Sequence, residues 1–235
     1  MRYAIYFTPP EGDRLAVAAS AWLGRDPGSI FPVGETEADG FSAAEISALT
    51  AEPRRYGFHA TLKAPFELAD NADEDALLSA FDAFAEAMSA IEINSLSLGQ
   101  LGSFFALVPG QWSNELEAFA AECVRHFEPF RAPISAADIQ RRKPDTLSAS
   151  QLHNLETWGY PYVFEDFRFH MTLTGQVPAE AQDAVRSALE ARFASFIGKP
   201  LDISHLALFA EPERGAPFYL KRIKPLRAAR EKRTA

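Results

Sequence analysis

A short stretch that occurs twice limits the possible folds of this chain more than any other feature. Residues 57–63 read Gly-Phe-His-Ala-Thr-Leu-Lys, and residues 168–174 read Arg-Phe-His-Met-Thr-Leu-Thr. Both copies contain Phe-His-x-Thr-Leu, and both alternate apolar with polar residues in the way that half-buried β-strands do. Because successive side chains of a strand point to opposite faces, each copy is predicted to bury one face and to leave the other open.

The alternation assigns the motif side chains to these two faces. The side chains predicted to pack inward are Phe58, Ala60, Leu62, Phe169, Met171 and Leu173. Those predicted to line the open face are His59, Thr61 and Lys63 in the first copy and Arg168, His170, Thr172 and Thr174 in the second. Two such strands lying side by side would form a pocket with two imidazoles and two hydroxyls, which suits a phosphate group.

The duplication continues beyond the motif. Each copy is followed by a predicted helix, an alternating strand and a second strand. These segments are 73–90, 91–98 and 104–108 after the first copy, and 179–196, 201–209 and 217–223 after the second. The repeated order predicts an α+β fold with two pseudo-symmetric lobes, each an antiparallel sheet backed by helices, that face each other across a central cleft.

The remaining segments fit a single bilobal domain over residues 1–235. Local patterns predict a strand over 2–8, helices over 15–23, 42–49 and 114–127, a loop over 24–40, and short helices and loops over 128–152 that cross between the halves. Ser42 is the expected N-cap of its helix. The basic segment at about 226–235 is expected to be a solvated C-terminal tail.

Charge and cysteine content limit the possible function classes. The formal net charge is −9, which argues against a protein that coats long nucleic acid. Cys123 is the one cysteine of the sequence, so no intrachain disulfide can form, and its predicted helix favours a buried, inert thiol. The chain starts with a strand pattern, without the features of a signal peptide or a membrane span, so we expect a cytoplasmic location.

The paired His-x-Thr-Leu strands and the duplicated architecture resemble the two-histidine phosphoesterase superfamily, which includes RNA 2′,3′-cyclic phosphodiesterases and ligases with the LigT-like fold. The resemblance covers essentially the whole chain. Residues 56–63 and 158–175 are similar, more narrowly, to a bacterial branch labelled as phosphonate-metabolism proteins. That branch is associated with carbon–phosphorus bond cleavage, in which a ribosyl cyclic phosphate must be opened. The resemblance therefore implies a cyclic phosphodiesterase.

The residue types of the two motifs are suited to this chemistry. Hydrolysis of a cyclic phosphodiester needs a base on the entering water, an acid on the leaving oxygen, and stabilisation of charge. His59 and His170 suit the acid and base roles, and either histidine can take either role. Thr61 and Thr172 would donate hydrogen bonds to the non-bridging oxygens. No cofactor or metal is expected, because the sequence has no Asp/His cluster at metal-ligand spacing.

Four further residues are candidates for substrate binding. Lys63 and Arg168 could pair with phosphate, and a solvated charge at a sheet edge is the competing interpretation for each. Tyr56 and Tyr160 could stack against a base or sugar, with packing at the pocket rim as the alternative. The basic residues 141–143 are interpreted as solvated loop cations.

We therefore expect a metal-independent phosphodiesterase that hydrolyses a small cyclic phosphodiester, of nucleotide or ribosyl type, by His/His general acid–base catalysis. The first alternative is an RNA 2′,3′-cyclic phosphodiesterase or an RNA ligase that acts on RNA ends. The second is a non-enzymatic RNA-binding module, which would require a basic, aromatic sheet face. The expected partner is a small phosphorylated substrate, with neither long nucleic acid nor a membrane, and the oligomeric state stays open.

Overall fold

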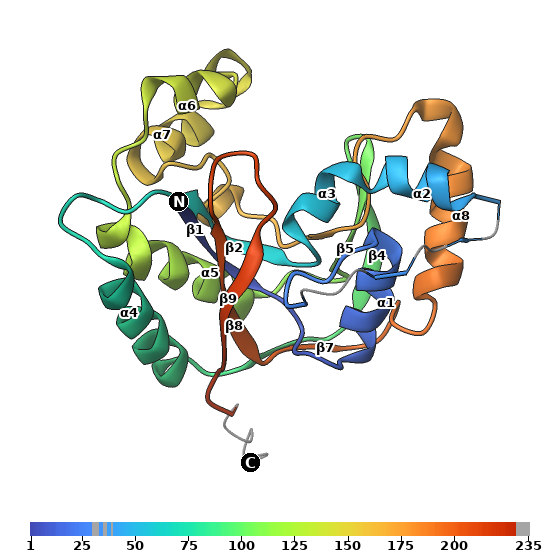
Figure 1. The fold of residues 1–235 in the computed structure, drawn as a ribbon, viewed down its shortest axis with the longest axis horizontal. Coiled ribbons are helices and arrows are strands. Elements are labelled where there is room, and N and C mark those ends of the chain that lie inside the picture. Colours follow the sequence, from blue (N-terminus) through green and yellow to red (C-terminus); the bar gives the residue numbers. More distant parts are fainter. Residues whose placement is uncertain (30–32, 35–36, 39, 229–235) are drawn as a thin grey trace.

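Seven antiparallel strands form the central sheet of the protein, in the order β4-β5-β6-β2-β1-β8-β9 (Figure 1). The structure is a computed structural model that describes residues 1–29, 33–34, 37–38 and 40–228. Parts of the predicted loop 24–40 and of the predicted tail 226–235 lie outside the described residues. The strand bounds are β1 (Arg2–Phe7), β2 (Ala60–Phe66), β4 (Leu96–Leu101), β5 (Phe104–Pro109), β6 (Met171–Thr172), β8 (His205–Glu211) and β9 (Tyr219–Pro225).

A second, two-stranded sheet pairs β3 (Ile91–Ile93) with β7 (Leu201–Ile203). The predicted strands 91–98 and 201–209 are therefore wrong as single strands, since each is two strands. The first three residues of each segment pair with one another, and the chain then continues as β4 and β8 in the central sheet. Each break marks a change of pairing partner, which a continuous run of alternating apolar residues does not reveal.

The helices lie largely where the sequence predicts. Their bounds are α1 (Arg14–Leu23), α2 (Ala43–Leu49), α3 (Ala51–Tyr56), α4 (Glu74–Ala87), α5 (Asn114–Phe127), α6 (Ala136–Arg141), α7 (Ala149–Trp158) and α8 (Gln182–Phe193). Ser42 caps α2 as predicted, in a capping box with Glu45. The sequence does not predict α3, whose C-cap is Gly57. Gly57 has a φ of +79°, and a Cβ there would lie 2.6 Å from Cγ of Pro27, so glycine is needed where the chain turns into the first motif.

The two copies of the duplicated unit share the central sheet. The motif strands β2 and β6 are neighbours within it. The β4–β5 hairpin of the first unit lies beside β6, and the β8–β9 hairpin of the second unit lies on the side of β2, with β1 between them. In Figure 1, α4, α6 and α7 lie toward one side of the molecule, and α1, α2, α3 and α8 toward the other. The predicted α+β class is confirmed, and the two halves meet in one continuous sheet.

The inward-facing side chains of both motifs are buried as predicted. Phe58, Ala60, Leu62, Phe169, Met171 and Leu173 are each no more than 4% exposed. Helix α5 packs against β2, and its Cys123 is fully buried, where desolvation raises the pKa of the thiol well above its ordinary value. Among the described residues, no helix has both the length and the apolarity that crossing a membrane requires.

Candidate active site

Strands β2 and β6 bring the two histidines together. Ala60 of β2 pairs with Met171 of β6, and each of these residues directly follows a motif histidine. The antiparallel register, continued by one residue in each direction, sets each histidine opposite the threonine of the other copy. The four predicted catalytic residues, His59, Thr61, His170 and Thr172, all line one cavity of about 430 Å³. We call this cavity the histidine pocket.

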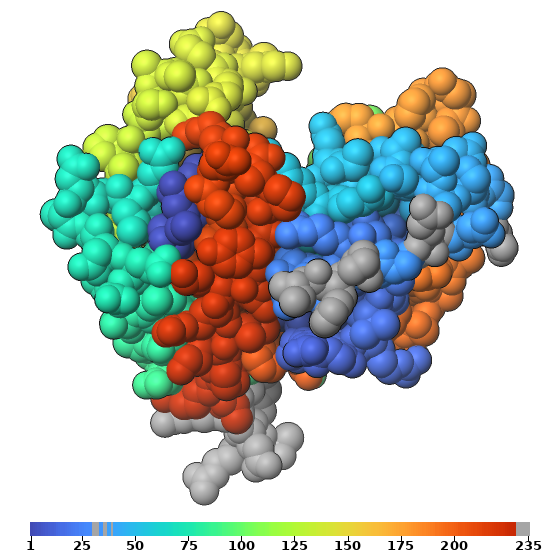
Figure 2. All heavy atoms as spheres, in the orientation of Figure 1, coloured from blue at the N-terminus to red at the C-terminus, as the bar shows by residue number. Residues whose placement is uncertain are grey.

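The walls of the histidine pocket come from separate parts of the chain. Helix α3 contributes Pro53 and Tyr56, and the segment that follows α7 contributes Tyr160. Figure 2 shows the molecule hollowed between its α6 end and its α2–α3 side. Both tyrosines that the sequence identifies as substrate-binding candidates therefore lie beside the histidines.

Equivalent hydrogen bonds hold the two imidazoles. Nδ1 of His59 lies 2.9 Å from the carbonyl oxygen of Gly57, and Nδ1 of His170 lies 2.8 Å from that of Arg168. A carbonyl oxygen can only accept a hydrogen bond, so Nδ1 carries the proton in each neutral ring. Nε2 is therefore the nitrogen of each ring that is available for acid–base chemistry.

Aromatic side chains help to shield the histidines from water. His59 is stacked on Tyr6, with ring centroids 4.0 Å apart, and His170 lies 5.9 Å from the ring of Phe104. Burial lowers the pKa of His59 to about 4, opposed by the hydrogen bond to Gly57 and assisted by the charge of His170. Burial also lowers the pKa of His170 below its ordinary value. Both rings are therefore neutral near neutral pH in the free protein.

The threonines of the motifs differ in what they contact. Oγ1 of Thr61 lies 3.3 Å from Nε2 of His59, so its hydroxyl can donate to the neutral ring. Thr174 also lines the pocket, but its hydroxyl accepts the backbone N–H of Phe105 at 2.9 Å, and the residue is 1% exposed. Thr174 therefore fixes the second motif to β5, whereas the hydroxyl of Thr61 contacts His59 inside the pocket.

Lys63 does not line the histidine pocket, and its predicted placement on the face of His59 is wrong. The residue is 3% exposed, and Nζ donates to the carboxylate of Glu128 at 2.7 Å. The cause is the register of β2 against β1, in which Tyr6 pairs with Thr61 but Ile5 pairs with Lys63. This bulge adds one residue to β2 and turns the lysine toward α5, away from the histidines.

Arg168 also lies outside the histidine pocket, which corrects its predicted position beside His170. Its guanidinium donates to the backbone carbonyls of Glu165 at 3.0 Å and Phe167 at 2.5 Å, and the residue is exposed. Strand β6 begins only at Met171, so the alternation of a strand does not extend back to Arg168.

The lining of the pocket also includes Arg2, Tyr6 and Arg142, which the sequence did not identify as candidates. Arg2 and Tyr6 lie on β1, and their even spacing would have placed them on one face. The position of β1 beside β2 does not follow from that spacing. Arg142 belongs to the basic run interpreted above as solvated loop cations, but its guanidinium lies 4.9 Å from the ring centroid of Tyr160. Within the part of the chain that the structure describes, no group of three or more His, Cys, Asp and Glu side chains could hold a metal ion.

Two curated proteins are similar to the chain in sequence. The chain is 41% identical to "Ribose 1,5-bisphosphate phosphokinase PhnN" of Janthinobacterium sp. (strain Marseille), over 92% of this chain and 49% of that protein. It is 35% identical to a protein of the same name from Laribacter hongkongensis (strain HLHK9), over 95% of this chain and 51% of that protein. The chain thus spans about half the length of these relatives.

The chain also matches solved structures and a family model. The crystal structure of a phosphoesterase matches with a TM-score of 0.43 and 13% identity, over 96% of this chain and 98% of that one. The crystal structure of E. coli LigT complexed with 3′-AMP matches with a TM-score of 0.40 and 12% identity, over 96% and 98% of the two chains. The family model described as "Protein of unknown function (DUF1045)" matches residues 61–219, and the chain belongs to this family.

Proposed function

We propose that the protein is a metal-independent phosphodiesterase that hydrolyses a small cyclic phosphodiester. The observation that carries the proposal is the matched pair of imidazoles in one pocket, each with Nδ1 bonded to the carbonyl two residues before it and Nε2 available. A pair of positioned imidazoles can supply one base and one acid to the same phosphorus. Thr61 and Thr172 add two hydroxyl donors for the non-bridging oxygens.

The proposed reaction is an in-line displacement by water. Nε2 of the neutral histidine takes a proton from the water as its oxygen bonds to phosphorus. Nε2–H of the other, protonated histidine gives its proton to the leaving ester oxygen as the ring P–O bond breaks. The products are a phosphomonoester and a neighbouring hydroxyl, and exchange with solvent restores the starting protonation states. Because both rings are neutral in the free protein, the acid must gain its proton when the anionic substrate binds.

The proposed substrate is a nucleotide or ribosyl cyclic phosphate of monomer size, in phosphonate catabolism. Two observations support this class. The sequence resemblance implies a pathway in which a ribosyl cyclic phosphate is opened. The curated relatives, of which this chain matches about half, have a name that specifies ribose 1,5-bisphosphate. Opening a cyclic phosphate on ribose gives a ribose phosphate, which is the same class of compound.

The decisive experiment is a hydrolysis assay in the presence of EDTA. Adenosine 2′,3′-cyclic phosphate and a ribosyl 1,2-cyclic phosphate should be opened under exhaustive chelation, and His59→Asn should abolish most of the turnover. The asparagine amide can still donate to Gly57, so the variant removes Nε2 while it preserves the local hydrogen bond. Activity that disappears with EDTA and returns with a divalent ion would point to a metal-assisted mechanism and would overturn the proposal.

A further inference from the structure

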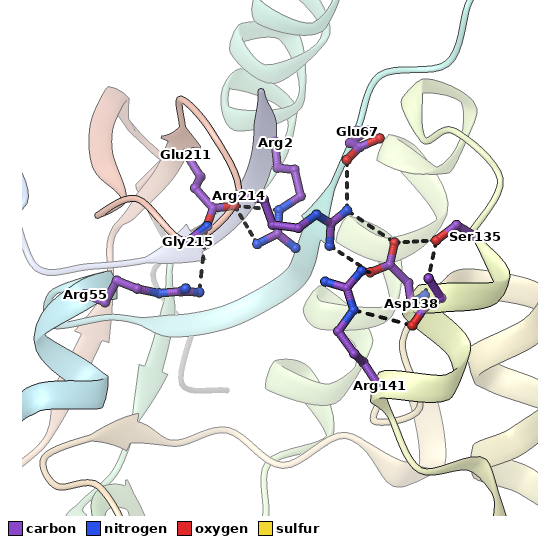
Figure 3. Close-up of polar contacts among 10 residues, drawn as sticks. Arg2, Arg55, Glu67, Ser135, Asp138, Arg141, Glu211, Arg214 and Gly215 are labelled. Atoms are coloured by element: carbon purple, nitrogen blue, oxygen red, sulfur yellow. Dashed lines mark hydrogen bonds and ion pairs between the residues drawn. The ribbon is translucent and has the colours of Figure 1, made fainter.

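A second cavity, of about 470 Å³, adjoins the histidine pocket and shares Arg2, Tyr56, Pro65 and Arg142 with it. Six arginines line it: Arg2, Arg55, Arg131, Arg141, Arg142 and Arg214. They come from β1, α3, α6 and the connecting segments, so the tertiary fold and not a local charge run gathers them. We call it the arginine cavity, and Figure 3 shows most of its charged side chains.

The carboxylates around the arginine cavity are fewer than its arginines. Arg2 and Arg55 share one fully buried carboxylate, Glu211, at 2.5 and 3.7 Å. Arg214 and Arg141 both contact the Oδ1 atom of Asp138, at 2.7 and 3.0 Å.

Two further carboxylates complete the set. Glu67 binds Arg214 at 2.9 Å, and Glu128 binds Arg131 at 2.6 Å while it also holds Lys63. Six arginines therefore face four carboxylates. In a chain with a net charge of −9, this local excess of cations fits an anionic ligand.

Arg142 and Arg55 are the arginines best placed to hold such a ligand. Arg142 contacts no carboxylate in the part of the chain that the structure describes, and it lies on the border between the two cavities. Nη2 of Arg55 lies 3.7 Å from Glu211, and this carboxylate is already paired with Arg2. The same Nη2 donates to the hydroxyl of Tyr56 at 2.7 Å. A guanidinium can offer two parallel N–H donors to a phosphate, which an ammonium cannot do.

We infer that the arginine cavity binds a second, non-reacting phosphate group of the substrate, a phosphomonoester on the molecule whose cyclic phosphate lies between His59 and His170. The inference rests on the proposed function and names its substrate class more narrowly. A phosphomonoester carries nearly two negative charges near neutral pH, which matches the excess of arginines. The two cavities adjoin, so one small molecule can reach both.

The test compares adenosine 2′,3′-cyclic phosphate with the same compound bearing a 5′-phosphate. The added phosphate should raise kcat/KM of the wild-type protein by about tenfold or more, the effect of one or two charge-assisted hydrogen bonds. In Arg142→Gln and Arg55→Gln, the ratio of the two kcat/KM values should fall to near one. Neither variant leaves a buried carboxylate alone, since Arg142 has no carboxylate partner and Glu211 keeps Arg2. Arg142 also lines the histidine pocket, but both substrates carry the same cyclic phosphate there. An effect of Arg142→Gln on that pocket therefore cancels in the ratio of the two kcat/KM values, which reports the 5′-phosphate.

The matched control is Arg125→Gln, because Arg125 is exposed, pairs with Glu122 on its own helix, and lines neither cavity. It should keep the wild-type ratio. A wild-type ratio near one, or an unchanged ratio in both cavity variants, overturns the inference.

A binding measurement separates this inference from the proposed function. Ribose 5-phosphate has no cyclic ester to be opened, so its affinity can be measured by calorimetry whether or not the protein is a phosphodiesterase. We expect Arg142→Gln and Arg55→Gln each to weaken its binding by about tenfold, and His59→Asn to preserve it. If no cyclic phosphate is hydrolysed but this pattern is found, only the proposed reaction fails. If ribose 5-phosphate binds equally well to the wild type and both arginine variants, the arginine cavity is not a phosphate site.

Discussion

The imidazole of His59 lies against the phenol ring of Tyr6, with ring centroids 4.0 Å apart and an angle of 25° between the planes. Tyr6 is 1% exposed, so this contact removes one face of the imidazole from water. Desolvation is the main reason that the pKa of His59 falls to about 4. The neutral state of the ring therefore depends on a residue from β1 that lies far from either motif in the sequence.

Replacing Tyr6 with leucine should raise the pKa of His59 toward its ordinary value of 6.5, because water reaches the imidazole where the ring was. The shift can be followed by NMR of the histidine side-chain resonances between pH 3 and 8. Tyr162→Leu is the control, since Tyr162 is 44% exposed and does not line the histidine pocket. An unchanged His59 titration in Tyr6→Leu would show that the stacked ring does not control the protonation of His59.

The two depressed pKa values predict the pH dependence of the proposed reaction. The reacting form has one neutral and one protonated histidine, and in the free protein both histidines have pKa values below 6.5. The pH profile of kcat/KM, which reports the free protein, should be bell-shaped with its maximum below pH 6.5. The profile of kcat should lie at higher pH, since a bound phosphate anion raises the pKa of the neighbouring acid. A kcat/KM that is constant across this range would contradict the paired mechanism.

Substitution of either histidine should remove most of the activity and leave the fold intact. His59→Asn and His170→Asn are each expected to lower kcat by about a hundredfold or more, the usual effect of losing a general acid or base. Thr61→Val and Thr172→Val should lower it less, because each removes one hydroxyl donor while both imidazoles remain. His205→Asn is the matched control, since His205 contacts Ser204 and lines neither cavity. Thermal unfolding should show similar melting temperatures, and a histidine variant with wild-type turnover would disprove the role of that residue.

The motif alternation predicted the core face of both strands but failed at Lys63 for a physical reason. Phe58 to Leu62 follow the period of two, and the predicted pocket follows from it. The bulge before Lys63 depends on how β2 pairs with β1, a contact between segments more than 50 residues apart. The pattern within one segment carries no information on such pairing.

Lys63→Met tests this corrected position. The lysine contacts Glu128 and not the histidine pocket, so kcat/KM should stay near the wild-type value. Glu128 keeps Arg131 at 2.6 Å, so the free energy of unfolding should change by no more than about 2 kcal/mol. Urea denaturation measures the second quantity. A large increase in KM without loss of stability would show that Lys63 binds the substrate.

The arginines show a second limit of sequence reasoning. The basic run 141–143 is visible in the sequence, but Arg2 and Arg214 have no basic neighbour in the sequence, and Arg55 has only Arg54. Only the fold brings them into one cavity. A convergence of cations from distant segments has no local signature, whereas the repeated motif has one, because the same residue pattern occurs twice along the chain.

The last prediction concerns the size of the substrate. A cyclic phosphate of monomer size should be hydrolysed with a higher kcat/KM than an RNA oligomer that ends in a 2′,3′-cyclic phosphate. The net charge of −9 repels a polyanion, and each additional phosphate gains affinity only where a cation meets it. The excess arginines are confined to one cavity beside the histidines, which suits one or two phosphates and not a strand.

Comparing kcat/KM of both substrates at low and high salt measures this preference. Truncation after residue 228 removes Arg230, Lys232 and Arg233 and tests whether the basic tail recruits RNA. The contrary result is that the truncated protein also hydrolyses the oligomer with the higher kcat/KM, by a factor that falls steeply as salt is added. That result would show that the substrate is an RNA end and not a small cyclic phosphate.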